Sequence, residues 1–155
     1  MLDRFLLFSS YMEELSLYDP EIRNMTPEEF TSWFNEYLSD DYCFTDVVVD
    51  GHIVGFVIIS APGSSKCCDG CDYHIVQAYI RPEYRRKGLM AKTMVDIFSK
   101  NKGSYCYEVL AGNDGAKAFW DKLFTMVHAI DIPVMQGDLP NLQLYIKEVP
   151  SVTHP

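Results

Sequence analysis

Apolar residues recur at helical spacing over the first forty positions. One stripe ends before Asp19-Pro20 and consists of Phe5, Phe8, Met12 and Leu15. Its three- and four-residue steps predict a first helix. Thr26-Pro27-Glu28-Glu29 then supplies a hydroxyl N-cap, a proline at the first helical position and a glutamate placed for a capping box. A second helix is predicted after this segment, with an apolar face made of Phe30, Trp33, Phe34, Tyr37 and Leu38.

The pattern then changes to that of β-strands. Residues 44–49 and 52–59 are rich in β-branched side chains and flank Asp50-Gly51, a dipeptide that suits the positive backbone angles of a tight turn. These two segments predict an antiparallel hairpin. A polar loop, residues 60–70, leads to a third strand at about residues 73–80, which Pro82 stops because it cannot donate a ladder hydrogen bond.

The second half of the chain alternates helices and strands. A third helix starts at the Lys87-Gly88 turn and ends near Asn101-Lys102-Gly103, and its apolar stripe predicts that one side packs on a sheet. A strand is predicted at 105–110, a helix capped by Asn113 follows, and two closing strands are expected near 126–132 and 142–146. This order indicates an α+β, or mixed α/β, fold around one mixed sheet.

Length and composition are those of one compact domain. The chain has 155 residues, of which 48% are hydrophobic and 23% charged, too apolar for a disordered segment. The longest apolar stretch, residues 53–59, is far shorter than the roughly 20 residues needed to span a bilayer. The first residues lack the order of a signal peptide, so we expect a cytoplasmic protein without membrane attachment. Five cysteines in such a chain predict reduced thiols rather than a disulfide framework.

The net charge bears on which classes of binding partner the protein can have. Twenty-two acidic against thirteen basic side chains give a formal charge of -9, the wrong sign for binding a nucleic-acid backbone and a favourable one for attracting cations. Solubility alone is the simpler explanation of this charge, because net charge says little about function.

The most informative stretch runs from Tyr79 to Met90, where a strand passes through a basic, glycine-containing turn into a helix. Backbone N–H groups of such a turn point toward one place, and the helix N-terminus adds a partial positive charge, which suits a pyrophosphate. Gly88 permits close approach of a phosphate to the backbone of the turn. Charged side chains for a nucleotide phosphate are supplied by Arg85, Arg86 and Lys87. On these residues alone, an ordinary solvated turn with a basic surface remains the alternative.

Two motifs in this order resemble the GNAT acetyltransferases. The family's pyrophosphate loop reads Gln/Arg-x-x-Gly-x-Gly/Ala after a strand that ends in aliphatic-x-Pro, and Arg85, Gly88 and Ile80-Arg81-Pro82 match it. Leu89 follows the glycine, and Met90 departs from the usual Gly or Ala. The second motif resembles the helix that lines the pantetheine arm in the family, and its matching residues are Asn113, Ala116, Phe119, Trp120 and Leu123.

The resemblance implies one GNAT-like domain over residues 1–155, with a helical substrate side in 1–42 and an acetyl-CoA-binding core in 43–149. Its sheet is expected to be mixed, mostly antiparallel, covered by helices on both faces and splayed between the family's strands four and five, here 73–80 and 105–110. Unpaired backbone groups at about Tyr79 and Ile80 would then bind the acetyl carbonyl and the pantetheine amides.

The implied activity is transfer of an acetyl group from acetyl-CoA to a primary amine by direct attack, with no metal required. An alkylammonium with a pKa near ~10.4 must first lose a proton. His74 is the first candidate base and Glu108 on the next strand the second; a histidine on a strand surface without such a role is the alternative. Gln77 cannot act as a base. The acceptor is expected to be a small-molecule or peptide amine that is cationic before deprotonation, and a homodimer is left open.

The acid that protonates the leaving thiolate is less clear from the sequence. The family's usual tyrosine is replaced by Trp120, which either packs against pantetheine or belongs to the core, so the alternatives are water, an unprotonated thiolate, or a tyrosine at position 84, 107 or 145.

Other functions stay open at this stage. Trp120, Met90 and Gln77 favour a non-catalytic acyl-CoA-binding or regulatory module. The Cys67-Cys68-Asp69-Gly70-Cys71 segment followed by His74 has metal-ligand residue types at short spacing, so a small zinc-binding interaction protein is a further alternative. A second ligand pair is missing, and a reduced loop without metal is the prediction.

Overall fold

The computed structural model describes residues 1–134 and 141–151. The elements are α1 (Leu2–Leu15), α2 (Pro20–Arg23), α3 (Pro27–Tyr37), β1 (Tyr42–Val49), β2 (His52–Ser60), β3 (Tyr73–Ile80), the 3₁₀ helix η1 (Pro82–Tyr84), α4 (Leu89–Lys100), β4 (Gly103–Leu110), α5 (Asp114–Met126), β5 (Ile130–Ile132) and β6 (Leu142–Val149). The strands form one open sheet in the order β1-β2-β3-β4-β6-β5. The mixed α/β fold predicted from the sequence is therefore confirmed.

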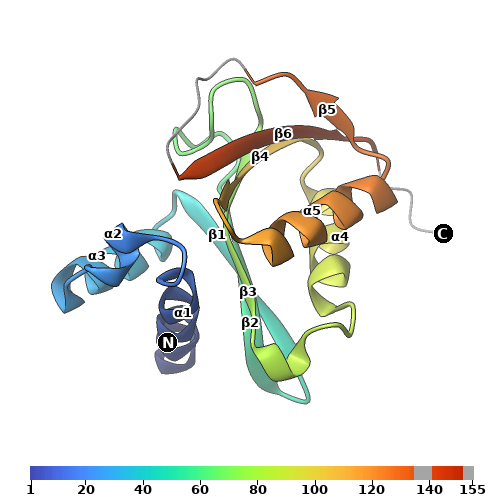
Figure 1. Cartoon of the computed structure of the whole chain (residues 1–155). Coiled ribbons are helices and arrows are strands. Elements are labelled where there is room, and N and C mark those ends of the chain that lie inside the picture. The colour runs from blue at the N-terminus through green and yellow to red at the C-terminus, as the bar shows by residue number, and fades with distance from the viewer. Residues whose placement is uncertain (135–140, 152–155) are drawn as a thin grey trace.

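Helices cover both faces of this sheet (Figure 1). Alternate residues of β2 divide between the two sides: Phe56 and Ile58 pack with α1 and α3, whereas Val57 and Ile59 pack with α4 and α5. Alternation places the core of the N-terminal helices and the core of the later helices on opposite faces. Within the residues described, no helix combines the length and apolar character that crossing a bilayer requires.

The capping and turn motifs identified in the sequence are present in the structure. The Thr26 hydroxyl accepts from the Glu29 N–H, and the Glu29 carboxylate accepts from the Thr26 N–H, which completes the capping box. Asp50 and Gly51 both have left-handed backbone, with φ of 50° and 79°, as a tight hairpin turn requires. The Asn113 side chain accepts from the N–H of Ala116 and caps α5.

The structure differs from the sequence prediction in one missed helix and at several strand ends; β1 and β4 each begin two residues earlier than predicted, at Tyr42 and Gly103. The short helix α2 was not predicted. The strand expected from residue 126 begins only at Ile130, because α5 continues to Met126 with Phe124 buried in the core. The strand expected to end at 146 continues to Val149, because it pairs with β4 over the whole length of that strand.

The sheet opens between β3 and β4. These strands are parallel and pair at only three positions, the last of which joins Ile75 to Tyr107. A register shift in the β2–β3 ladder lies at the same level, because Ile59 pairs with Ile75 and Ile58 with Gln77, which leaves Val76 as an extra residue in β3. Such a bulge bends its strand. Figure 1 shows β4 and β6 turning away from β2 and β3, so the predicted splay is confirmed and begins at Val76.

Candidate functional site

The turn between β3 and α4 presents a row of free backbone donors. The first backbone bond of α4 runs from Lys92 N–H to the Gly88 carbonyl. The N–H groups of Arg86 and of residues 88–91 have no acceptor within the described part of the chain. Free donors at a helix N-terminus, together with the helix dipole, form an anion-binding site.

Left-handed backbone at Arg86 (φ 63°) and Gly88 (φ 74°) shapes this turn. A left-handed arginine is uncommon and points to a local constraint. A Cβ on Gly88 would meet no atom within 4 Å, so the space in front of the glycine is open. The geometry of the turn therefore fits the pyrophosphate cradle predicted from the sequence.

The side chain of Arg85 is held by the protein itself. Its Nε donates to the Ile80 carbonyl at 2.8 Å and its Nη2 to Glu14 of α1 at 2.6 Å, and the guanidinium lies 5.5 Å from the centre of the Tyr79 ring. Arg85 thus connects the end of β3 to α1. We expected the backbone groups of Ile80 to be unpaired. This is wrong for the Ile80 carbonyl, because it accepts a hydrogen bond from Arg85.

The other basic residues of the turn are exposed. The Lys87 ammonium lies 5.4 Å from the centre of the Tyr84 ring, and Arg86 is exposed. Leu89 and Met90 are half-buried and pack inward against core residues. The Met90 side chain therefore does not occupy the space in front of the turn, although this position departs from the family pattern.

The C-terminal end of β3 contacts the N-terminal helices. Tyr79 is the register partner of Phe56 in β2, and its ring centre lies 5.3 Å from that of Tyr11 in α1. Burial raises the pKa of Tyr11 well above its ordinary value, and a contact of its hydroxyl with the Ala78 backbone N–H acts in the opposite direction. Tyr11 is part of this surface and gave no signal in the sequence beyond its place beside the stripe of α1.

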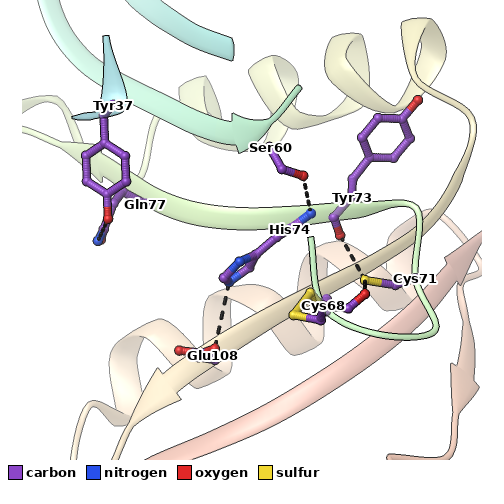
Figure 2. Close-up of polar contacts among 9 residues, drawn as sticks. Tyr37, Ser60, Cys68, Cys71, Tyr73, His74, Gln77 and Glu108 are labelled. Atoms are coloured by element: carbon purple, nitrogen blue, oxygen red, sulfur yellow. Dashed lines mark hydrogen bonds and ion pairs between the residues drawn. A yellow bond between two sulfur atoms is a disulfide. The ribbon is translucent and has the colours of Figure 1, made fainter. Parts of the chain in front are cut away.

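His74 and Glu108 meet at the closed end of the splay. The His74 Nε2 lies 3.8 Å from a Glu108 carboxylate oxygen, as Figure 2 shows. Both residues sit beside the last paired positions of the two strands, which brings side chains 34 positions apart into contact. Burial lowers the pKa of His74 below its ordinary value, and the Glu108 carboxylate opposes this shift. The neutral imidazole, which can accept a proton, is therefore favoured near neutral pH.

Hydrogen bonds fix the residues around His74. The His74 backbone N–H donates to the hydroxyl of Ser60, which is fully buried at the end of β2, at 2.9 Å. The Gln77 amide donates to the Tyr37 hydroxyl of α3 at 3.1 Å; both residues are drawn in Figure 2. Gln77 therefore serves as a hydrogen-bond donor that connects β3 to α3. Ser60 and Tyr37 were not singled out as site residues from the sequence, since only the fold brings them to β3.

In helix α5, the Trp120 side chain of the motif that resembles the pantetheine-lining helix is buried in the core. Trp120 is 8% exposed, and its ring centre lies 5.3 Å from that of Tyr107. Of the two roles left open for Trp120, the core position is the one seen. The Tyr107 and Tyr145 hydroxyls are buried without a hydrogen-bond partner among the described residues, and burial raises the pKa of Tyr107 well above its ordinary value.

The prediction of reduced cysteines is wrong for two of the five. Cys68, in the loop between β2 and β3, and Cys106, on β4, are joined in a disulfide across 38 positions of sequence. The Cys67, Cys68 and Cys71 cluster considered as a metal site is not assembled. Instead, potential ligand atoms of Cys68, His74 and Cys106 lie within 4.8 Å of one another. Cys106 was missed because nothing in the chain pattern links it to the loop.

A hollow in the described part of the chain lies elsewhere. It has a volume of about 310 Å³ and is bounded by α1, α2 and the start of α3, including Met12, Arg23 and Phe30. Neither Gly88 nor His74 lines it. The turn and the end of the β3–β4 pairing remain the candidate site, because they hold the free backbone donors and the His74–Glu108 pair.

Comparison with known proteins identifies similar sequences and folds. The model of the acetyltransferase (GNAT) family matches residues 8–125, which include β3, the turn and most of α5. No curated protein matches the chain in sequence.

Solved structures share the fold at low sequence identity. An N-acetyltransferase from Staphylococcus aureus Mu50 has a TM-score of 0.61 and 14% identity, with 94% of each chain covered. The PaiA N-acetyltransferase from Thermoplasma acidophilum, in complex with coenzyme A, has a TM-score of 0.53 and 15% identity, covering 93% of this chain and 94% of that one. The diaminobutyrate acetyltransferase from Paenibacillus lautus, in complex with L-2,4-diaminobutyric acid and coenzyme A, has a TM-score of 0.54 and 11% identity, covering 85% and 83%.

Proposed function

Because this chain belongs to the acetyltransferase (GNAT) family, we propose that it transfers the acetyl group of acetyl-CoA to a primary amine on a small molecule or a peptide. Two of the similar folds were solved with coenzyme A, and one of them acts on diaminobutyric acid. The cytoplasmic location predicted from the sequence is part of the proposal.

The observation that carries the proposal is the opening of the sheet between β3 and β4. At one end of the free part of β3 lies the turn at Gly88, whose unbonded N–H groups suit a pyrophosphate. At the other end, where the strands still pair, lie His74 and Glu108. An extended cosubstrate lying along β3 would have its phosphates at the first place and its acyl group near the second.

His74 is the residue best placed to take a proton from the amine. It is largely buried, its imidazole faces a carboxylate, and its lowered pKa keeps it neutral near pH 7. An alkylammonium has a pKa near ~10.4, so direct attack needs a base that accepts its proton, with or without an intervening water. Glu108 would hold the imidazole in place and stabilise it once it is charged.

For protonation of the leaving thiolate, the described part of the chain offers weaker candidates. Trp120 is in the core and its indole is no acid near neutral pH. The raised pKa of Tyr107 makes proton donation from that hydroxyl less favourable. A thiol has a pKa near ~8.5, so the thiolate can leave unprotonated or take a proton from water.

A Glu108→Gln variant distinguishes between His74 and Glu108 as the general base. If His74 is the base, removing the carboxylate takes away the charge that raises the pKa of His74. The acidic limb of kcat/KM against pH then moves to lower pH while the rate on the plateau stays within about tenfold of wild type. A loss of roughly 10²–10⁴ on the plateau would instead assign the base to Glu108.

The charge of -9 predicts a cationic acceptor. Attraction between this acidic protein and an ammonium group weakens as salt is added, so the KM for the acceptor is expected to rise between about 10 mM and 500 mM ionic strength. Initial rates at several salt concentrations measure this, with the KM for acetyl-CoA followed in parallel. A preference for neutral or acidic acceptors would overturn the prediction.

A screen of acetyl-CoA with a panel of amines, read by mass spectrometry, tests the activity itself. Acetylated product from at least one amine, absent without protein, is the expected result. The core position of Trp120 favours one alternative, a module that binds acyl-CoA without turnover. Coenzyme A binding with no acetylated product across polyamines, aminoglycosides, amino acids and peptides would favour that alternative.

A further inference from the structure

Three side chains of metal-ligand type meet beside the proposed base. They are Cys68 of the loop between β2 and β3, His74 of β3 and Cys106 of β4, and one potential ligand atom from each lies within 4.8 Å of the others. The two sulfurs are joined as a disulfide in this structure. Figure 2 shows Cys68 close to the His74 side chain, at the edge of the His74–Glu108 pair.

The backbone holds two of these residues rigidly. His74 and Cys106 are register partners in the short parallel pairing of β3 with β4. Cys106 is fully buried and the His74 side chain largely so. Register partners project to the same face of a sheet, so the distance between these side chains is set by the ladder and not by a loop.

The third residue, Cys68, lies in a loop that is anchored to β4. Asp72, at the end of the loop, accepts hydrogen bonds from the backbone N–H and the hydroxyl of Ser104 on β4. The Cys71 thiol donates to the carbonyls of Cys68 and Tyr73. These hydrogen bonds therefore hold Cys68 close to β4, the strand that carries Cys106.

We propose that Cys68, His74 and Cys106 bind a thiophilic divalent cation such as Zn²⁺ when the disulfide is reduced. A dithiol reductant supplies the two electrons: one of its thiolates attacks the Cys68 sulfur, the Cys106 sulfur leaves, and the second thiol releases Cys68 as the reductant closes its own disulfide. The cation then displaces the two thiol protons and binds both thiolates and one imidazole nitrogen.

The distances suit this ligand set. Zn²⁺ binds thiolate sulfur at about 2.3 Å and imidazole nitrogen at about 2.0–2.1 Å, so tetrahedral ligand atoms lie roughly 3.5–3.8 Å apart. The three atoms need to approach this spacing from within 4.8 Å, and the sulfurs must separate from their bond. Cys68 can make this adjustment because it lies in a loop, whereas the other two ligands are on strands. The fourth position stays open to water or to Glu108, 3.8 Å from His74.

The remaining loop cysteines have other partners. The Cys67 thiol donates to the Ser64 carbonyl, and the Cys71 thiol donates to two backbone carbonyls of the loop. Neither belongs to the group that meets at His74. This makes Cys67, the sequence neighbour of Cys68, a matched control.

The metal site does not rest on the proposed acetyl transfer, although it would affect it. A bound cation would occupy the imidazole that we propose as the base, and the disulfide excludes the cation because both need the same two sulfurs. His74 would then be available as a base both in the disulfide form and in reduced, metal-free protein.

Co²⁺ titration of the full-length protein tests this site, because sulfur-to-cobalt absorption in the near ultraviolet reports thiolate ligands independently of activity. Wild type is reduced with dithiothreitol, desalted without oxygen and compared with the disulfide form, whose bond is verified by peptide mass mapping. We expect one Co²⁺ per reduced chain with that absorption, displacement by Zn²⁺, and no uptake by the oxidised protein. Equal uptake by both forms would overturn the proposal.

Variants identify the ligands. Cys68→Ser and His74→Asn are each expected to weaken Co²⁺ binding by about 100-fold or more, whereas Cys67→Ser retains wild-type affinity. Cys68 lies in a half-buried loop, so its variant is expected to fold, and circular dichroism verifies this for each protein. Wild-type affinity in Cys68→Ser, or an equal loss in Cys67→Ser, would show that the cation binds elsewhere.

Discussion

Replacing His74 with alanine is expected to lower kcat/KM for the amine by roughly 10²–10⁴ while leaving the affinity for coenzyme A within about twofold of wild type. The reason is that proton acceptance matters in the transition state, whereas the proposed cosubstrate contacts lie at the Gly88 turn. Steady-state kinetics with the best amine from the screen, together with calorimetric titration of coenzyme A, measure the two quantities separately.

The pH profile separates a base from a structural residue. Burial lowers the pKa of His74, so the acidic limb of the wild-type profile should lie below the ordinary histidine value near ~6.5, and it should disappear in His74→Ala. His52→Ala is the control, since His52 is exposed at the start of β2, and it should leave rate and profile unchanged. Wild-type activity in His74→Ala across the pH range would transfer the role to Glu108 or to water.

Replacing Gly88 with aspartate is expected to abolish stabilisation by coenzyme A. A ligand at a hundredfold excess over its Kd stabilises the folded state by about 2.7 kcal/mol, which differential scanning fluorimetry detects as a rise in Tm. The space in front of Gly88 is open, so the aspartate carboxylate can stand where the free N–H groups converge and repel a pyrophosphate.

Gly88→Asn is the matched control for that result. Asparagine has almost the same size and, like glycine, tolerates the left-handed backbone seen at this position, where φ is 74°. Both variants should therefore lose similar stability without ligand. Coenzyme A should still raise the Tm of Gly88→Asn, though less than that of wild type. An unchanged shift in a folded Gly88→Asp protein would remove this turn from the cosubstrate site.

Local signals predicted the elements that carry the site. The capping box at Thr26, the Asp50-Gly51 turn and the Asn113 cap each depend on residues at most three positions apart, so their physics can be read from a short segment. The same holds for the strand, basic turn and helix around Gly88. The resemblance of this segment to the GNAT acetyltransferases supplied the family, which the match over residues 8–125 confirms.

Boundaries decided by packing were predicted less well. α5 extends to Met126 because Leu123 and Phe124 are buried against the core, and β6 extends to Val149 because β4 offers a partner at every position. Burial and strand pairing act between distant segments, and they override the local preference for a strand near residue 126.

The sequence by itself therefore determined the fold class, a candidate anion-binding turn and two candidate bases, since each depends on short-range pattern or on a family motif. Only the tertiary structure decided the surroundings of His74: the short parallel pairing of β3 with β4 sets its imidazole 3.8 Å from Glu108 and beside the sulfurs of Cys68 and Cys106. The contacts of His74 with Glu108 and Cys106, and of Cys68 with Cys106, join residues more than 30 positions apart. No local pattern encodes such a contact, because it depends on which strands become neighbours and where they separate.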